Sequence, residues 1–316
     1  MKQMVCALVP NQEVVSYFLI VDAPQVRKSK KGSDYACLEL VDKSGKVDAR
    51  LWDIPIGLDV NTFKKVVVKV KGQTSEWDGK LQISISQIRI VNGGDEVDMA
   101  DFFERSVRDP EEMWQELLGI VQDRLTSWGP IQKLLVKVLT ENEANFKKAP
   151  AAKSVHHNYL GGLLEHTLSM CHTVVIISEK YQLNVDLMVA ACVLHDIGKV
   201  HELSYEMGTS YTVEGTLIGH IPIGLLLTNK AIEEIDDFPA SLKMALLHLI
   251  ASHHGRLEWG SPKVPLMREA IAFHLVDMLD SQLAICDRVM KAGVGPDGLS
   301  EWSKEIGGPL YKLPEA

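Results

Sequence analysis

The hydrophobic pattern of this chain changes its period near residue 92, and this change limits the possible folds more than any other feature. Before it, apolar residues alternate with polar ones, as at Leu81, Ile83 and Ile85, which is typical of strands with one buried face. From Met113 the apolar spacing becomes helical and remains so to about residue 292. Asn92-Gly-Gly-Asp95 separates the two patterns. We therefore expect a multidomain protein, with an N-terminal all-β domain and a C-terminal all-α domain.

The first 92 residues predict five strands. In the last of them the alternation changes parity between Ile85 and Ile88, which predicts a β-bulge near Ser86 and Gln87. A short segment at 55–63 separates the third strand from the fourth. Five strands with a short helix at this place are the pattern of an oligonucleotide-binding (OB) barrel, although periodicity alone also allows another small barrel. The expected strands are 14–21, 35–41, 47–52, 64–70 and 81–91.

The rest of the chain predicts a linker and then a helical domain. Residues 1–92 form the expected OB-fold nucleic-acid-binding domain, 93–112 an acidic linker, and 113–316 the all-helical domain with its core at about 150–292. Turn residues such as Gly129-Pro130 and Ser261-Pro262 separate the helices. The expected helices are 113–126, 130–140, 160–180, 185–197, 216–234, 239–252 and 265–291.

Charge is distributed unevenly between these parts. The net charge of −9 divides into +4 for residues 1–92 and −13 for residues 93–316. A basic module attracts polyanions, and an acidic one can hold metal cations. The division therefore suggests a nucleic-acid-binding part and a metal-binding part.

Several classes of protein are excluded by composition. The longest unbroken apolar run is the eight residues 187–194, whereas a membrane-spanning helix needs about 20. The N-terminus has no apolar core of signal-peptide length, so we expect a cytoplasmic protein without membrane contact. The five cysteines are scattered and include no Cys-x-x-Cys pair, which argues against a disulfide framework or a thiolate zinc site.

The residues that carry chemistry centre on Leu194-His-Asp-Ile-Gly-Lys199. Adjacent His195 and Asp196 at a helix end can both reach one metal ion, and the two oxygens of Asp196 can bridge two ions. Asn184 is a suitable N-cap for the helix, and Gly198 suits its end. Further histidines and an aspartate lie on either side of this segment: His166, His220, the pair His253-His254, and Asp277.

This order resembles that of the HD-domain metal-dependent phosphohydrolases. The resemblance implies one metal site made by the ordered set His…His-Asp…Asp, which falls on His166, His195, Asp196 and Asp277. Members with a second metal add one histidine and then a His-His pair, which fall on His220, His253 and His254, with Asp196 as the bridge. All seven positions are filled in the expected order.

Such a site suits hydrolysis of a phosphodiester by a metal-activated hydroxide. Mixed imidazole and carboxylate ligands favour Mn, Fe, Co, Ni or Zn over Mg alone. Two such ions lower the pKa of a shared water and neutralise charge on the phosphate oxygens. Lys199 lies one helical turn after His195 and is expected to contact the scissile phosphate, and His157 is a weaker candidate for substrate contact or proton transfer.

A narrower resemblance is to the YhaM-type 3′–5′ exoribonucleases, in which an OB module precedes an HD domain. It spans about residues 11–290, and its most specific part is Ser252-His-His-Gly-Arg-Leu-Glu-Trp-Gly-Ser-Pro262. Gln282 stands where that family often has a lysine. The resemblance implies manganese-dependent removal of nucleoside 5′-monophosphates from the 3′ end of single-stranded RNA, with single-stranded DNA as a second substrate. The other resembling stretches are 40–53, 150–157 and 161–168.

The barrel would then hold the single strand. OB modules bind single strands by a basic groove and by stacking of bases on aromatic side chains. A basic loop after the first strand offers Arg27, Lys28, Lys30 and Lys31. The further candidates for nucleic-acid contact are Tyr35, Trp52, Lys71, Trp77 and Lys80.

Two other functions use the same residues. A cyclic-dinucleotide phosphodiesterase would share the metal ligands, but the Gly-Tyr-Pro signature of one such group is absent, and Gly260-Ser-Pro262 stands near its place. A non-catalytic RNA-binding protein would leave the metal site idle. Metal content and turnover separate the binding protein from the enzymes, and a homo-oligomer is compatible with all three.

Overall fold

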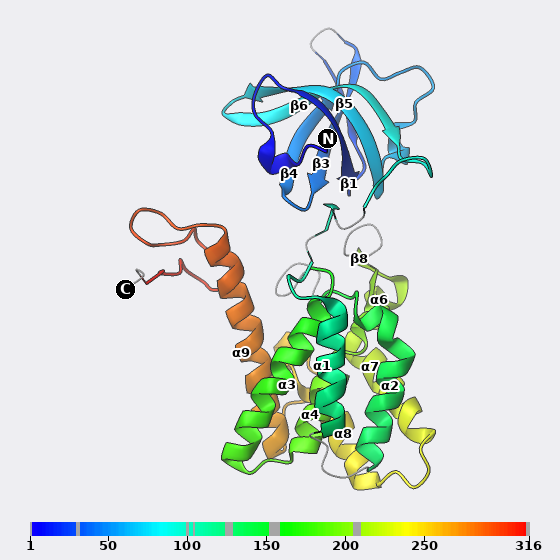
Figure 1. Ribbon diagram of the computed structural model, residues 1–316, viewed down its shortest axis with the longest axis vertical. Helices are drawn as coiled ribbons and strands as arrows, with labels where there is room; N and C mark the ends of the chain where they lie inside the picture. Colours follow the sequence, from blue (N-terminus) through cyan, green and yellow to red (C-terminus); the bar gives the residue numbers. More distant parts are fainter. Residues whose placement is uncertain are drawn as a thin grey trace. The chain divides into compact units, whose positions relative to one another are not determined.

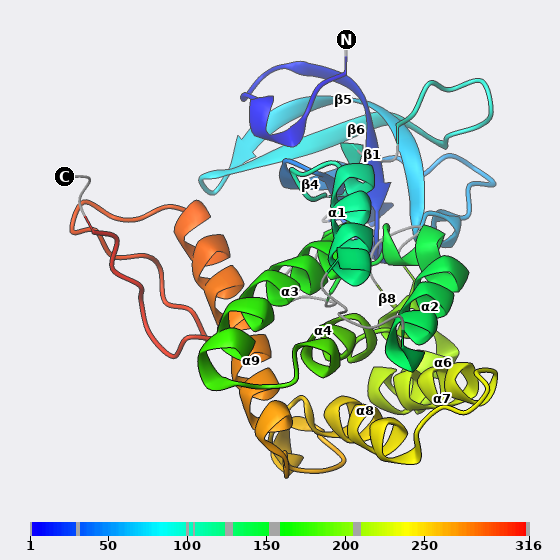
Figure 2. The same ribbon diagram turned by 60° about the horizontal axis from the view of Figure 1, so that its bottom comes forward.

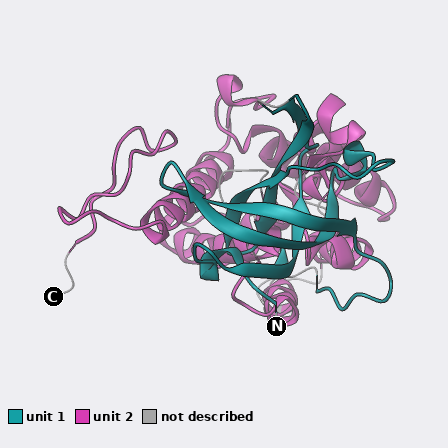
Figure 3. Ribbon diagram, turned by 90° about the horizontal axis from the view of Figure 1, so that it is seen from above, with its two compact units in different colours: residues 1–104, 206–208 teal, residues 105–205, 209–316 magenta. Residues whose placement is uncertain are grey.

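The computed structural model describes residues 2–29, 32–98, 101–103, 105–123, 129–151, 159–204 and 210–313, and it forms two compact units (Figure 1 and Figure 3). The division along the chain falls at residues 104 and 105. The first unit is a curled β-sheet and the second is mainly helical. This confirms the architecture that the change of hydrophobic period predicts.

The sheet of the first unit has the strand order of an OB barrel. Its order is β1-β5-β6-β4-β3-β2, and β1 and β3 also meet at a single register pair, Leu19 opposite Val41. Among the strands of this sheet that the structure describes, only β4 and β6 pair in parallel. Without β2, the five remaining strands follow one another around the curled sheet as in an OB fold. The strands are β1 (Glu13–Ile20), β2 (Gln25–Lys28), β3 (Asp34–Asp42), β4 (Gly45–Leu51), β5 (Val66–Trp77) and β6 (Lys80–Ile90).

The sixth strand corrects the expectation of five strands and of a basic loop at 27–31. Gln25–Lys28 forms β2, which pairs antiparallel with β3, so Arg27 and Lys28 lie on a strand. All four residues of β2 are exposed. The hydrophobic pattern reports strands through their buried face, and a strand held only by its ladder hydrogen bonds leaves no such pattern.

The predicted bulge is confirmed in β6. Lys71 pairs with Gln87 and Gly72 pairs with Ile85, so Ser86 has no partner in the register. The hydroxyl of Ser86 donates to the backbone carbonyl of Lys71 at 3.0 Å. The extra residue bends the strand and helps the sheet to curl.

The start of the acidic segment belongs to the barrel unit. Asp95 accepts two hydrogen bonds of 2.7 Å from the guanidinium of Arg89, and these bonds hold the pKa of Asp95 well below its usual range. Phe102 is buried against Leu19 and Val67. The acidic charge of this stretch is thus partly neutralised by cations of the barrel.

The second unit is built around one buried helix, α4 (Val185–Leu194). All its residues from 187 to 194 are buried, and it packs against α2, α3, α8 and α9 (Figure 2). A helix that is apolar on every side belongs inside a bundle. Its end therefore delivers the following residues, His195 and Asp196, to the interior. The other helices are α1 (Pro110–Asp123), α2 (Pro130–Phe146), α3 (Gly162–Tyr181), α5 (Lys199–Glu202), α6 (Val213–Leu217), α7 (His220–Glu233), α8 (Ala240–Ser252) and α9 (Arg268–Lys291).

Two local features differ from the helical prediction. The helix expected at 216–234 is divided into α6 and α7, because Gly219 has φ +81° and ends the helical backbone between them. A two-stranded pair, β7 (Leu203–Ser204) with β8 (Ser210–Tyr211), also lies within this unit. None of the described helices is long and apolar enough to cross a membrane.

Candidate metal centre

The side chains of the seven predicted ligands come from five helices and the turns at their ends. Asn184 caps α4 by accepting a hydrogen bond of 3.0 Å from the Leu187 amide, as predicted. The helix ends at Leu194, and His195 and Asp196 follow directly. His166 comes from α3 and Asp277 from α9. His220 begins α7, and His253 and His254 follow α8.

We call His166, His195 and Asp277 the inner half of the centre. His166 Nε2 lies 3.4 Å from His195 Nε2 and 3.4 Å from Asp277 Oδ1. Both histidines are fully buried. Asp196 Oδ2 lies 3.2 Å from His195 Nε2, which joins this aspartate to the inner half.

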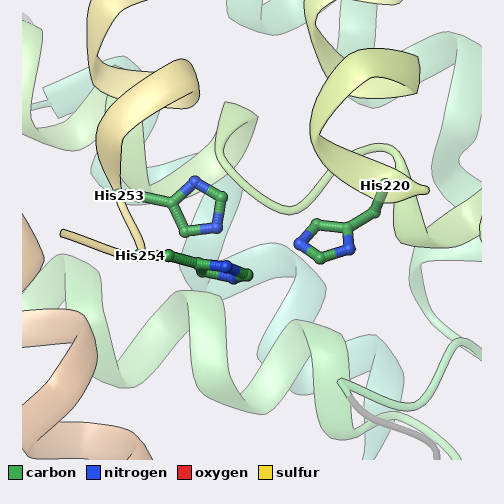
Figure 4. A group of neighbouring side chains, drawn as sticks. All are labelled: His220, His253 and His254. Atoms are coloured by element: carbon green, nitrogen blue, oxygen red, sulfur yellow. The ribbon is translucent and has the colours of Figure 1, made fainter. Parts of the chain in front are cut away.

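We call His220, His253 and His254 the outer half. The three rings point toward one another (Figure 4), and their ligand atoms all lie within 4.8 Å of one another. Asp196 Oδ1 lies 3.5 Å from His220 Nε2 and 3.7 Å from His253 Nε2. Asp196 thus presents one oxygen to each half, as a bridging carboxylate would.

In each of the five histidines of the predicted ligand set, the other ring nitrogen, Nδ1, is hydrogen bonded. His195, His253 and His254 each place Nδ1 against a backbone carbonyl, those of Cys192, Ile250 and Trp259 at 3.0, 2.8 and 2.9 Å. The remaining two use carboxylates: His166 Nδ1 lies 2.7 Å from Asp280 Oδ2, and His220 Nδ1 lies 3.1 Å from Glu202 Oε1. A ring that donates from Nδ1 presents the lone pair of Nε2, the arrangement that metal-binding histidines have.

Three buried atoms test whether these residues fit a cation. Asp196 Oδ1, His220 Nε2 and His253 Nε2 are buried and have no hydrogen-bond partner among the described residues. With Nδ1 as the donor, all three present lone pairs to the same space, and buried acceptors facing one another are costly unless a positive charge joins them. The donor set therefore fits divalent cations.

Gly198 has a different role from the helix-end role expected for it. Its φ of −62° is ordinary helical backbone. A Cβ atom at this position would lie 2.0 Å from the His220 carbonyl oxygen. The absence of a side chain thus lets α7 approach the turn after Asp196, which brings His220 to the centre.

Burial and neighbouring charges shift the histidine pKa values in opposite directions in the two halves. Burial opposes charge on His166, but the hydrogen bonds with Asp277 and Asp280 outweigh it and raise the pKa of His166 to about 9. Burial and the nearby His195 hold the pKa of His253 well below its ordinary value. Burial also lowers the pKa of His254. Near neutral pH, His253 and His254 are therefore neutral and able to bind metal.

Lys199 is buried and its ammonium donates to Asp196 Oδ2 at 2.5 Å. Burial opposes the charge on Asp196, yet Lys199 and His195 hold the pKa of Asp196 well below its usual range. Lys199 therefore keeps Asp196 ionised and in place. Contact of Lys199 with a phosphate stays a prediction.

The structure adds two carboxylates that the sequence pattern did not identify. Glu202 binds both the ring and the backbone amide of His220, the latter at 2.9 Å. Asp280 binds His166 and also accepts a hydrogen bond from the Ser169 hydroxyl. Asp280 lies one turn after Asp277, so helical spacing is the one signal that could have indicated it. Glu202 reaches His220 because α5 packs against α7, and no spacing rule indicates that contact.

The barrel brings some of the candidate nucleic-acid contacts together. Arg27 lies opposite Tyr35 in the register of β2 and β3. The rings of Tyr35 and Trp52 stack with centroids 4.8 Å apart, and Trp52 is 45% exposed, so it is not part of the barrel core. An exposed cation beside stacked rings suits a single strand.

The other candidates lie elsewhere. Trp77 and Lys80 pair at the β5–β6 hairpin and are exposed. Lys71 lies on β5, which β6 and β4 separate from β3 in the sheet order, and its ammonium is 3.2 Å from Glu13 Oε1. Lys28 is exposed at the end of β2. The remaining candidates, Lys30, Lys31 and His157, lie outside the described residues.

Comparison with known proteins finds one family match within the second unit. Residues 163–282 match the model of the HD domain, and this range contains all seven predicted ligands. An HD domain indicates a metal-dependent phosphohydrolase, in agreement with the donor set.

Solved structures with some similarity include two from replication protein A and an aspartyl-tRNA synthetase. The second OB-fold domain of replication protein A from Methanococcus maripaludis is 22% identical over 31% of this chain and 100% of that chain, with a TM-score of 0.25. A replication protein A heterotrimer bound to single-stranded DNA is 14% identical over 29% of this chain and 66% of that chain, with a TM-score of 0.20. Aspartyl-tRNA synthetase from Entamoeba histolytica is 8% identical over 55% of this chain and 35% of that chain, with a TM-score of 0.20.

Proposed function

We propose that this chain is a metal-dependent 3′–5′ exoribonuclease that acts on single-stranded RNA and also on single-stranded DNA. The observation that carries the proposal is the convergence of Asp196 Oδ1, His220 Nε2 and His253 Nε2, which are buried without hydrogen-bond partners inside a set of seven ligands. The same chain has an OB strand order with a stacked Tyr35–Trp52 pair at its surface. A phosphodiester-cleaving centre joined to a single-strand-binding module suits a nuclease better than an enzyme for a small diester.

The reaction adds water across the bond between phosphorus and the O3′ atom of the preceding nucleotide. Phosphorus keeps the new oxygen, O3′ of the shortened strand takes a proton, and a nucleoside 5′-monophosphate leaves. Two divalent cations, manganese by preference, would supply activation of the water and neutralisation of the phosphate oxygens when bound.

The protein residues hold this centre in one arrangement. Asp196 offers an oxygen to each half, and Lys199 keeps that carboxylate ionised. Glu202 and Asp280 fix the rings of His220 and His166 through Nδ1. Because every ring is oriented in advance, no rotamer search accompanies metal or substrate binding.

We assign substrate binding to residues 1–92 and hydrolysis to 113–316. Arg27, Tyr35 and Trp52 are the contacts that the barrel geometry supports best, because they are adjacent, with Arg27 and Trp52 exposed and Tyr35 half-buried. If the division holds, deletion of residues 1–92 slows the degradation of long RNA more than that of short oligonucleotides. Equal slowing at both lengths would contradict it.

The test is a time course on 5′-labelled single-stranded RNA with manganese. Wild type is compared with Asp196→Ala and with Asp236→Ala, which removes an exposed carboxylate of the same unit. We expect a descending ladder with wild type and Asp236→Ala, and intact RNA with Asp196→Ala. Intact RNA in all lanes would remove the nuclease proposal, and cyclic dinucleotides would be assayed next. Absence of turnover on these as well would leave a binding protein.

A further inference from the structure

A short exposed turn beside the outer half has no role in the proposed function described above. The chain leaves α8 through His253, His254 and Gly255, and then forms a 3-10 turn over Leu257–Trp259. The backbone carbonyl of Trp259 accepts the hydrogen bond from His254 Nδ1 at 2.9 Å. The turn is therefore bonded directly to a predicted metal ligand.

This turn is rigidly held at both ends. Ser261 is buried, its amide donates to the Arg256 carbonyl at 3.2 Å, and its hydroxyl donates to the carbonyls of Ala251 and Lys263. At the other end, His274 lies so close to Gly255 that a Cβ there would come within 2.3 Å of its ring. The backbone of the turn is thus held by hydrogen bonds, while the side chains of residues 256–259 are exposed.

Those side chains form a cation and aromatic pair. The Arg256 guanidinium lies 4.8 Å from the centroid of the Trp259 ring. The His274 ring approaches Trp259 at 6.2 Å and a tilt of 47°, so it does not stack on the indole. Trp259 is 50% exposed. Among the residues that the structure describes, no carboxylate forms an ion pair with Arg256.

An exposed indole and a guanidinium can bind two different parts of a nucleotide, the base and the phosphate. Every base has a flat face that stacks on an aromatic ring, whatever its sequence. A guanidinium binds phosphate oxygens with two parallel hydrogen bonds. Both groups lie on a rigid turn attached to His254, so a nucleotide that reaches the metal centre meets them together.

We propose that Arg256 and Trp259 form the subsite for the terminal nucleotide of the strand, with Trp259 stacking on the base and Arg256 binding phosphate. The inference rests on the proposed nuclease function and names how that site holds its substrate. It assigns recognition of the end of the strand to the helical unit, separately from the barrel. It also predicts that any base is accepted, because stacking does not depend on the hydrogen-bonding edges of the base.

The test measures binding rather than turnover. Adenosine 5′-monophosphate and ribose 5-phosphate, which lacks the base, are titrated calorimetrically into full-length protein supplied with manganese. We expect Trp259→Ala to weaken adenosine 5′-monophosphate by about 5-fold to 100-fold and to leave ribose 5-phosphate unchanged. Trp259→Phe should restore most of the affinity, and Arg256→Ala should weaken both ligands.

A control variant removes another exposed ring. Trp302→Ala removes a tryptophan of the same unit that is 69% exposed. This variant should keep the wild-type affinity for adenosine 5′-monophosphate. Unchanged affinity in Trp259→Ala would overturn the proposal. Equal loss of both ligands in that variant would also overturn it, because a damaged turn rather than lost stacking would explain the result.

A failure of the proposed function would look different. If wild type leaves RNA intact but Trp259→Ala still loses only the base-dependent affinity, the subsite exists and the nuclease proposal fails. If wild type degrades RNA but Trp259 makes no base-dependent contribution, the nuclease proposal stands and the subsite fails.

Discussion

The two halves of the metal centre share Asp196 but differ in charge. The inner half contains a carboxylate of its own, Asp277, and its His166 is further held by Asp280. The outer half consists of three imidazoles, and the carboxylate that supports it, Glu202, binds Nδ1 and the backbone amide of His220 rather than Nε2. The inner half thus offers a cation two carboxylate ligands, Asp277 and Asp196, whereas the outer half offers only the shared Asp196.

This difference predicts unequal affinity within one centre. Carboxylates attract a divalent cation by charge, whereas neutral imidazoles bind by their lone pairs and discriminate more among metals. We therefore expect the inner half to bind more tightly and the outer half to exchange its ion first. The shared Asp196 means that neither half is independent of the other.

Removal of the shared ligand should have the largest effect. Asp196→Ala takes an oxygen from both halves and leaves Lys199 buried without its partner. We expect metal content by mass spectrometry to fall at both halves and turnover to fall more than about 1,000-fold. RNA affinity measured by fluorescence anisotropy should remain near wild type, because the barrel residues are unchanged. Retention of one tightly bound metal in Asp196→Ala would show that the inner half does not need the bridge.

Ligands that belong to one half should separate the two ions. Asp277→Asn should remove the inner ion and, through the shared Asp196, weaken the outer one. His254→Gln should remove only the outer ion, so about one equivalent of metal remains after dialysis. Metal stoichiometry and chelator titration of the two variants provide the comparison. Equal metal loss from both would contradict the unequal affinity of the halves.

The sequence predicted which side chains meet at this centre better than it predicted the residues that support them. His166, His220 and Asp277 could be proposed as ligands before the fold because their order along the chain resembles that of HD-domain proteins. Glu202 is not part of that order, and its position beside His220 depends on how α5 and α7 pack. The positions of supporting residues depend on the distances between packed helices, and the amino-acid sequence does not give those distances directly.

The same limit applied to the fold. The buried faces of β1 and β6 produced alternation that predicted the strands and the bulge at Ser86. The exposed strand β2 produced none, and the break between α6 and α7 at Gly219 was concealed by apolar residues on both sides. Periodicity reports burial, so elements without a buried face and interruptions inside an apolar run escape it.

The supporting carboxylates should act each on its own half. Glu202→Gln and Asp280→Asn keep the shape of the side chain and remove the charge that orients a histidine ring. We expect about 10-fold to 100-fold weaker metal binding at the outer half for the first and at the inner half for the second. Manganese titration followed by electron paramagnetic resonance measures both affinities, and Ser169→Ala is a milder control beside Asp280. If either variant weakened both halves alike, the carboxylates would support the fold rather than individual ligands.

The smallest expected effect is the number of protons released when the centre takes up metal. The pKa of His166 is raised to about 9, so at pH 7.5 its imidazole is largely protonated and must lose a proton before Nε2 can bind an ion. His253 and His254 have lowered pKa values and are already neutral at this pH. Binding of metal by His166 should therefore add about one proton to the release from the inner half, whereas His253 and His254 add almost none to that from the outer half, and the contribution of His166 should disappear as the pH rises above about 9. Calorimetry in two buffers of different ionisation enthalpy measures the difference. In Asp280→Asn the raised pKa of His166 loses one of its causes, so fewer protons should be released, and an unchanged number would place the titrating group elsewhere.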